Sequence, residues 1–244
     1  MSDKPLKIKV IGAGGIGSYL ILVLSRFVNF KSPGSSITVV DGDVYEHKNR
    51  ERQEFDKIGN KAEINIATLK DKFSDIEFHA ESVWLTDDTV DYLVEEGDIV
   101  FLCVDNHKTR KVISRFCEDE LKNIVLISGG NDYTDGNIQV YIKSEGKNIT
   151  QPLTNSRHPE IAQPADKSPE EMGCEELAAS DPQLIFTNLT AATMMLNAFY
   201  AYLEGKLDYD EAYFDILTNS SRTIKIEHQA EAVTKKKKSL FSIG

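Results

Sequence analysis

The most constraining feature of the sequence is a glycine turn, Gly12-x-Gly14-x-x-Gly17, placed between a strand-like run and a helical pattern. The run before it, 6–11, is short and rich in β-branched residues, and a second such run at 37–40 follows the helical pattern. Strand, glycine turn, helix and strand in this order form a βαβ unit, for which a parallel sheet is the default. Glycines at this turn let a phosphate approach the backbone at the N-terminus of the helix.

A nucleotide site is therefore predicted at this turn. Gly15 adds a fourth glycine at the start of the helix, and Asp41 directly follows the second strand-like run. A carboxylate in that place can accept hydrogen bonds from both hydroxyl groups of a ribose. The glycine pattern alone favours a dinucleotide, and the structural alternative is a tight turn with Asp41 as a cap.

Apolar runs and helical patterns continue to alternate as far as residue 130, where the pattern changes. Strands are expected at 76–80, 98–104 and 124–127, and helices at 61–73, 89–95 and 107–119. Alternation of polar and apolar residues at 137–142 indicates an antiparallel strand with one solvated face, and a helix at 183–203 and a hairpin at 213–227 follow. We predict an α/β fold with a Rossmann-like, mostly parallel sheet, helices on both faces and C-terminal antiparallel strands.

The chain is expected to form one large domain with four segments. These are a nucleotide-binding part at 1–145, a crossover loop at 146–174, a helix and hairpin at 175–234 and a basic tail at 235–244. Four of the seven prolines fall between residues 147 and 173. Because loops of this length are usually functional or disordered, we expect the crossover loop to be mobile.

Composition excludes several classes of protein. Among 244 residues, 28 Lys and Arg stand against 39 Asp and Glu, so a net charge of −11 argues against a general nucleic-acid binder. No apolar run reaches the roughly 18 residues of a membrane span, and the polar N-terminus predicts no signal peptide. Three cysteines, Cys103, Cys117 and Cys174, form neither a disulfide framework nor paired zinc spacings, which favours a reducing cytoplasm.

Three further motifs change the choice of nucleotide. Residues 41–53 read DGDVYEHKNRERQ, Lys61 opens a predicted helix, and Asp105-Asn106 follows a buried strand. In this order the motifs resemble the ThiF/MoeB/ubiquitin-activating-enzyme superfamily, whose hallmark is D-x-D-x-V-x-x-x-N-x-x-R-Q, then Gly…Lys at a helix start and Asp-Asn past a later strand. The resemblance is strong over about residues 6–130 and looser over 183–227.

The resemblance implies adenylation of a carboxylate with ATP and Mg²⁺, releasing pyrophosphate. It assigns Asp41 to the ribose, Asn49 and Arg52 to the phosphates, Lys61 to a second positive charge and Asp105 to Mg²⁺. An arginine fork suits phosphate oxygens, and a carboxylate is a hard ligand for a hard cation. The expected acceptor is the C-terminal glycine of a small ubiquitin-like or sulfur-carrier protein, threaded beside Asp105.

Two departures from the family pattern bear on partners. Many relatives bind a structural zinc through paired C-x-x-C motifs, and since this chain has none, we expect no structural zinc. Many relatives also carry an N-terminal arginine that crosses a dimer into the partner's ATP site. Nothing before Gly12 supplies an arginine here, so another residue or a partner protein must compensate within the expected homodimer or heterodimer.

Cys174 has two interpretations. In the crossover region of relatives a cysteine can form a persulfide or thioester, which would make Cys174 a catalytic nucleophile. Two glutamates follow it and would raise the pKa of its thiol, so a structural cysteine at the base of the long helix is the alternative. Cys103 and Cys117 are expected to be packing residues.

Two other function classes remain as alternatives. An NAD-dependent oxidoreductase would explain the glycine turn and Asp41, but not the set formed by Asn49, Arg52, Lys61 and Asp105. A catalytically silent subunit of an activating enzyme would explain the missing N-terminal arginine, although that same set argues against it. A variant of the main interpretation activates a small-molecule or RNA-borne carboxylate.

Overall fold

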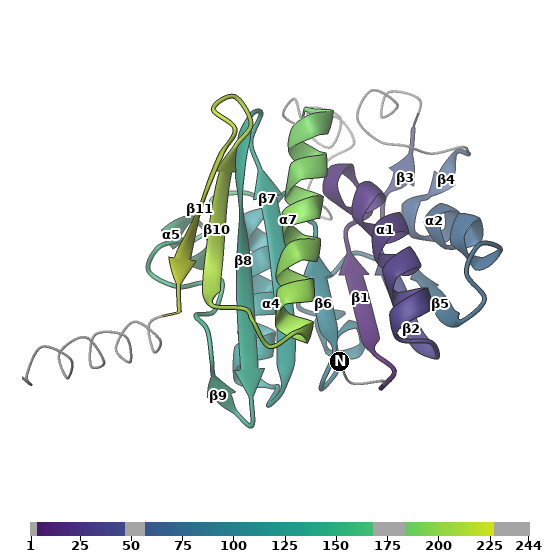
Figure 1. Cartoon of the computed structure of the whole chain (residues 1–244), viewed down its shortest axis with the longest axis horizontal. Coiled ribbons are helices and arrows are strands. Elements are labelled where there is room, and N and C mark those ends of the chain that lie inside the picture. Colours follow the sequence, from purple (N-terminus) through teal and green to yellow (C-terminus); the bar gives the residue numbers. More distant parts are fainter. Residues whose placement is uncertain (1–3, 47–56, 168–183, 227–244) are drawn as a thin grey trace, which may run out of the picture.

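In the computed structural model, which describes residues 4–46, 57–167 and 184–226, the strands join into a large twisted sheet (Figure 1). Its order is β11-β10-β8-β7-β6-β1-β2-β5, with β9 paired to β8. The strands are β1 (Lys7–Ile11), β2 (Ser35–Val40), β5 (Ile76–Glu81), β6 (Ile99–Leu102), β7 (Ile124–Asn131), β8 (Asp135–Ser144), β9 (Lys147–Asn148), β10 (Tyr209–Asp215) and β11 (Ser220–Lys225).

The predicted mixture of parallel and antiparallel pairing is confirmed. Strands β5, β2, β1, β6 and β7 pair in parallel, and β8, β10 and β11 extend the sheet in antiparallel fashion. The parallel strands therefore all end at one edge of the sheet, which we call the carboxyl edge. Strand β10 ends there too, because it runs antiparallel to β8 and so in the direction of β7. This edge lies at the top of Figure 1.

Helices cover both faces of the sheet, as predicted. They are α1 (Gly15–Lys31), α2 (Lys61–Lys70), α3 (Val90–Leu93), α4 (His107–Asp119), α5 (Pro159–Ala162) and α7 (Ile185–Leu203). Figure 1 looks onto the face that carries α7, α1 and α2, and α4 lies behind the sheet. Each face has its own hydrophobic core, one built with α1, α2 and α7 and the other with α3 and α4.

Helix α7 packs across β7, β8 and α1, and its buried residues include Ala191, Ala192 and Ala198. A Cβ atom on Gly129 of β7 would lie 2.3 Å from the sulfur of Met195, so a larger residue there would require the Met195 side chain to move. On the same face, the rings of Phe101 and Phe199 meet edge to face with their centroids 5.3 Å apart. The long helix expected from the sequence thus lies across the sheet.

The structure departs from the sequence expectations in length and in small elements. Helix α2 ends at Lys70, β6 is shorter than expected, and β7 is longer because it pairs with β8 along its whole length. A two-stranded sheet of β3 (Val44–Tyr45) and β4 (Gly59–Asn60) was not predicted. The segment expected as one long loop contains β9 and α5. None of the helices in the described ranges is long and apolar enough to cross a membrane.

Candidate functional site

The glycine turn joins β1 to α1 at the carboxyl edge and is too tight for side chains. Gly12 has φ +91°, and a Cβ atom there would lie 2.9 Å from the backbone carbonyl of Cys103. A Cβ atom on Gly17 would lie only 2.0 Å from the carbonyl oxygen of Gly12. Gly14 precedes α1 and has no side chain that could cap the helix. The first amide groups of α1 are therefore available to an anion.

Asp41 lies buried directly beside this turn. Its carboxylate accepts hydrogen bonds from the amide of Ala13 at 2.6 Å and from the amide of Asp43 at 2.9 Å. Burial raises the pKa of Asp41, and the nearby charge of Lys61 partly opposes that rise. Each oxygen of a carboxylate has a further lone pair, so the group can still accept from a ribose.

Lys61 opens α2 and points back toward Asp41 and Asp43. Asn60 caps the helix with its side-chain oxygen and donates its amide hydrogens to the carbonyls of Asp41, at 2.8 Å, and Asp43, at 3.1 Å. The ammonium of Lys61 forms an ion pair with Asp43 at 2.5 Å although only 6% of the residue is exposed. Asp43 thus holds the lysine at the site.

Tyr45 and Asn65 support the same site and were missed by sequence reasoning. The Tyr45 hydroxyl donates to the carbonyl of Ala13 at 3.1 Å and accepts from Asn65 at 2.7 Å. Burial raises the pKa of Tyr45 to about 12, so the phenol stays neutral. The Lys61 ammonium lies 5.9 Å from the centre of the Tyr45 ring. No local pattern marks these roles, because the contacts join β3, α2 and the glycine turn.

The one tryptophan of the sequence, Trp84, stands against the backbone beside Asp41. A Cβ atom on Gly42 would lie 2.7 Å from the indole ring, so the ring rests on the glycine itself. Trp84 follows β5, the strand next to β2, at the carboxyl edge. It gives the site a half-buried aromatic surface next to the predicted ribose position.

Asp105 is exposed on the connection between β6 and α4, at the same edge. The next residue, Asn106, caps α4 by accepting from the amide of Thr109 at 2.8 Å. The buried Arg110 fastens the connection by donating to the carbonyls of Val104, at 2.9 Å, and Gly129, at 3.0 Å. This rigid framework leaves the carboxylate of Asp105 facing solvent.

The residues present fit a magnesium ion that arrives with a triphosphate. Within the described ranges, no group of three or more His, Cys, Asp or Glu residues could hold a metal ion by itself. Mg²⁺ keeps several waters and is commonly bound by one or two carboxylates together with phosphates. A single exposed carboxylate such as Asp105 therefore matches that mode of binding.

Several predicted residues lie outside the described residues, namely Asn49, Arg52 and Cys174. The other two cysteines, Cys103 and Cys117, are buried, and burial raises the pKa of each thiol to about 12. Thiols with such a pKa are poor nucleophiles at neutral pH, which agrees with their predicted packing role.

An ionic cluster around two buried carboxylates joins the crossover segment to β10. Arg157 pairs with Asp210 at 2.9 Å and with Glu211 at 2.8 Å. His158 pairs with Glu160 at 2.9 Å and with Glu211 at 3.3 Å. Asp210 and Glu211 are almost fully buried. The cluster thus ties residues 157–160 of this proline-containing segment to β10.

This cluster predicts a pH dependence of stability. Burial alone would lower the pKa of His158, but its contacts with Glu211 and Glu160 raise it above the ordinary value. Burial alone would raise the pKa of Glu211, but His158, Tyr213 and Arg157 lower it to about 2. His158 therefore stabilises the fold below its ordinary pKa, and this contribution is lost as the pH rises through its raised pKa in the folded protein. The contribution of Glu211 is lost in the opposite direction, as the pH falls toward 2.

Thermal melting from about pH 5 to about pH 9 tests this dependence. We expect the melting temperature of the wild-type protein to fall over that range, and that of His158→Gln to fall by less because its contribution no longer titrates. Equal slopes for the two proteins would contradict the assigned role of His158.

One family profile and several solved structures match this chain. The sequence profile of the ThiF family matches residues 4–235. A crystal structure of E. coli MccB with ATP superposes with a TM-score of 0.67 at 17% identity, covering 91% of this chain and 64% of that chain. MccB, a microcin C7 biosynthetic enzyme, in complex with N-formylated MccA gives 0.69 at 17% identity with the same coverage.

A structure of PaaA superposes with a TM-score of 0.61 at 16% identity, again over 91% of this chain and 64% of that chain. The chain therefore spans 64% of the length of these relatives, and at such identities the likeness establishes the fold. No curated protein matches the sequence.

Proposed function

The chain belongs to the ThiF family, and we propose that it uses ATP to adenylate a carboxylate, releasing pyrophosphate. The observation that carries the proposal is the nearly buried Lys61, held by Asp43 beside Asp41 and the glycine turn. The pyrophosphate of a dinucleotide is held mainly by the glycine turn. A triphosphate carries more negative charge and so gains more from a nearby ammonium.

In the proposed reaction, an oxygen of the acceptor carboxylate attacks the α-phosphorus of ATP, and the bond to the β-phosphate breaks as pyrophosphate leaves with its electron pair. Asp41 would hold the ribose, and the free amides of α1 and the ammonium of Lys61 would hold phosphate oxygens. Mg²⁺ bound with ATP at Asp105 would neutralise phosphate charge. Asn49 and Arg52 keep the phosphate-binding roles that the family pattern predicts.

We propose a polypeptide C-terminus as the acceptor, most specifically the terminal glycine of a small ubiquitin-like or sulfur-carrier protein. The structure of MccB in complex with MccA supports an acceptor of polypeptide type. Cys174 would form the predicted persulfide or thioester in a covalent step after adenylation.

We propose that the protein forms a homodimer or heterodimer through the apolar face of α1 and α7, where Leu22, Val23 and Tyr200 are exposed. Light scattering measures the oligomeric state.

Exchange of labelled pyrophosphate into ATP tests the proposed function. Purified protein is assayed with a panel of small ubiquitin-fold carrier proteins that end in a free Gly-Gly carboxylate, and with the same carriers lacking the last glycine. Adenylation predicts exchange that needs both Mg²⁺ and an intact C-terminus. Exchange that is equally fast without a carrier, or no exchange with any carrier of the panel, would count against this acceptor class.

Nucleotide choice separates the proposal from an NAD-dependent oxidoreductase. We expect ATP to bind in calorimetry, to bind more weakly without Mg²⁺, and NAD to bind poorly, because Lys61 and Asp105 suit a metal-bound triphosphate. Fluorescence of Trp84, the single tryptophan, should change during the ATP titration, since its ring stands beside Asp41. Tight binding of NAD together with no response to ATP would favour the oxidoreductase.

A further inference from the structure

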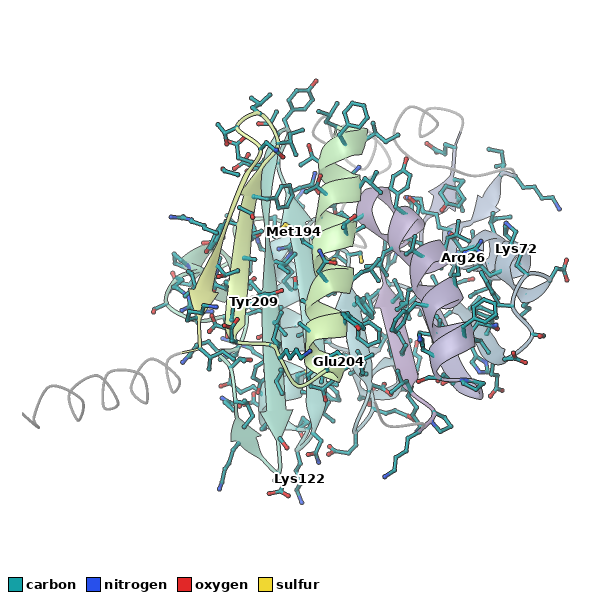
Figure 2. All side chains as sticks on the ribbon, viewed as in Figure 1. Arg26, Lys72, Lys122, Met194, Glu204 and Tyr209 are labelled. Atoms are coloured by element: carbon teal, nitrogen blue, oxygen red, sulfur yellow. The ribbon has the colours of Figure 1, made fainter. Side chains whose placement is uncertain are left out.

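Three large apolar side chains are exposed together at the carboxyl edge, away from the nucleotide site. Tyr133, in the turn between β7 and β8, is 56% exposed. Phe186, in the first turn of α7, is 65% exposed, and Leu217, in the turn between β10 and β11, is 77% exposed. Side chains extend past these two hairpin tips and the start of α7 at the top of Figure 2, whereas Lys122 marks the opposite edge.

Hydrogen bonds join the three segments into one surface. The hydroxyl of Thr187 donates to the carbonyl of Tyr133 at 2.7 Å, which ties α7 to the first hairpin. The amide of Ile216 donates to the carbonyl of Thr134 at 2.9 Å, which ties the second hairpin to the first. The three apolar side chains therefore project from segments that are hydrogen-bonded to one another. We call Tyr133, Phe186 and Leu217 the tip surface.

Carboxylates surround the tip surface. Asp132 and Asp135 flank Tyr133 and are exposed, and Asp215 precedes Leu217. Asp215 accepts from the amides of the turn that carries Leu217, the nearer at 2.8 Å. Asp132 and Asp135 form no ion pair with a cation of the described ranges. A partner that buried the tip surface would therefore need an apolar patch flanked by lysine or arginine.

The position of the tip surface relates it to the proposed reaction. Strand β10 is separated from β6, which leads to Asp105, by β8 and β7. At about 4.8 Å per strand, the spacing along the edge is roughly 14 Å. An extended chain rises about 3.3 Å per residue, so a tail of about five residues spans that interval. A protein seated on the tip surface could thus present its C-terminus near Asp105.

We propose that the tip surface docks the body of the acceptor protein, a small polypeptide with an apolar patch flanked by basic residues and an extended C-terminal tail. This inference rests on the proposed function, because it takes the acceptor to be a protein. Apolar contact in the centre would supply affinity. The surrounding carboxylates would select basic partners and speed their encounter.

Direct binding tests the proposal without reference to catalysis. Fluorescently labelled carriers of the panel with Gly-Gly tails are titrated with wild-type protein and with the double variant Tyr133→Ser, Leu217→Ser, with anisotropy as the readout. We expect at least one carrier to bind the wild type and to bind the double variant about tenfold more weakly or worse. Asp132→Lys should weaken binding at low salt and have less effect at high salt.

Tyr92→Ser is the matched control, because Tyr92 is 54% exposed on α3, which packs with α4 on the face of the sheet opposite α7. It should leave carrier binding unchanged, and all variants should bind ATP like the wild type and keep its melting temperature. Equal binding of a carrier by wild type and double variant, or no binding of any carrier by the wild type, would overturn the proposal.

Pyrophosphate exchange on the same proteins separates the two hypotheses. Carrier binding that depends on the tip surface, without exchange, would support docking and refute the proposed function. Carrier-dependent exchange, together with carrier binding that the double variant does not weaken, would support the proposed function and refute docking at the tip surface. A short peptide with only the Gly-Gly tail should support equally weak exchange in wild type and double variant, since it has no body to dock.

Discussion

The Asp105→Ala protein should lose carrier-dependent pyrophosphate exchange by about 100-fold or more, which corresponds to about 2.7 kcal/mol of activation free energy. The substitution removes the exposed carboxylate to which we assign the metal of the metal-bound triphosphate. Affinity for ATP in the presence of Mg²⁺ should fall as well, toward the value measured without Mg²⁺. Exchange assays and calorimetry on the same preparation measure both effects.

The fold should survive this change, because Asp105 is exposed on a connection that Asn106 and Arg110 already fasten. Asp87→Ala is a suitable control, since it removes another exposed carboxylate, from the turn between β5 and α3. It should keep exchange near the wild-type level. Wild-type exchange by a folded Asp105→Ala protein would show that another group holds the metal.

Much of the fold could be predicted because central parallel strands such as β6 and β7 are buried on both faces and contain apolar runs, whereas β5 at the end of the sheet alternates. Strand β6 is the clearest case, since all four of its residues are buried. The antiparallel strand β8 was recognised from its alternation. The small sheet of β3 and β4 was missed, because two residues per strand are too few to show any period.

Asp41 was singled out because it follows a strand, and Lys61 was singled out through the family resemblance. The two residues lie together in the structure, and their roles toward a nucleotide stay predictions. Tyr45 and Asn65 were not found, because their contacts depend on how β3 and α2 pack against the glycine turn. A buried tyrosine outside any long apolar pattern gave no local signal.

The crossover segment shows a different limit of sequence reasoning. Its prolines and charges are typical of a mobile loop, yet Arg157 and His158 bind acidic residues of β10. Those partners lie more than 50 positions further along the chain, so no local pattern could join them. Buried carboxylates in a strand were the available hint, since such groups are rarely left without a partner.

The second large effect is expected at the glycine turn, where Gly17→Ala should weaken ATP binding by about tenfold to 100-fold. The added Cβ atom would meet the carbonyl oxygen of Gly12 at 2.0 Å, far inside a normal contact. Gly12 cannot retreat, because it is itself close to the backbone of Cys103. The start of α1 must therefore move, and its amide groups leave the position that favours phosphate. Such overpacking commonly costs about 1–3 kcal/mol of stability.

Lost stability and lost binding can be separated with Gly146→Ala. Gly146 has φ +75° in a turn at the opposite edge, where an added Cβ atom meets nothing within 4 Å. Alanine there should cost about 1 kcal/mol of unfolding free energy through backbone strain alone. If ATP affinity depends on the position of the α1 amides, Gly146→Ala keeps it and Gly17→Ala loses it at comparable melting temperatures. Unchanged affinity in a folded Gly17→Ala protein would mean that the phosphates are held by side chains, with Lys61 the first candidate.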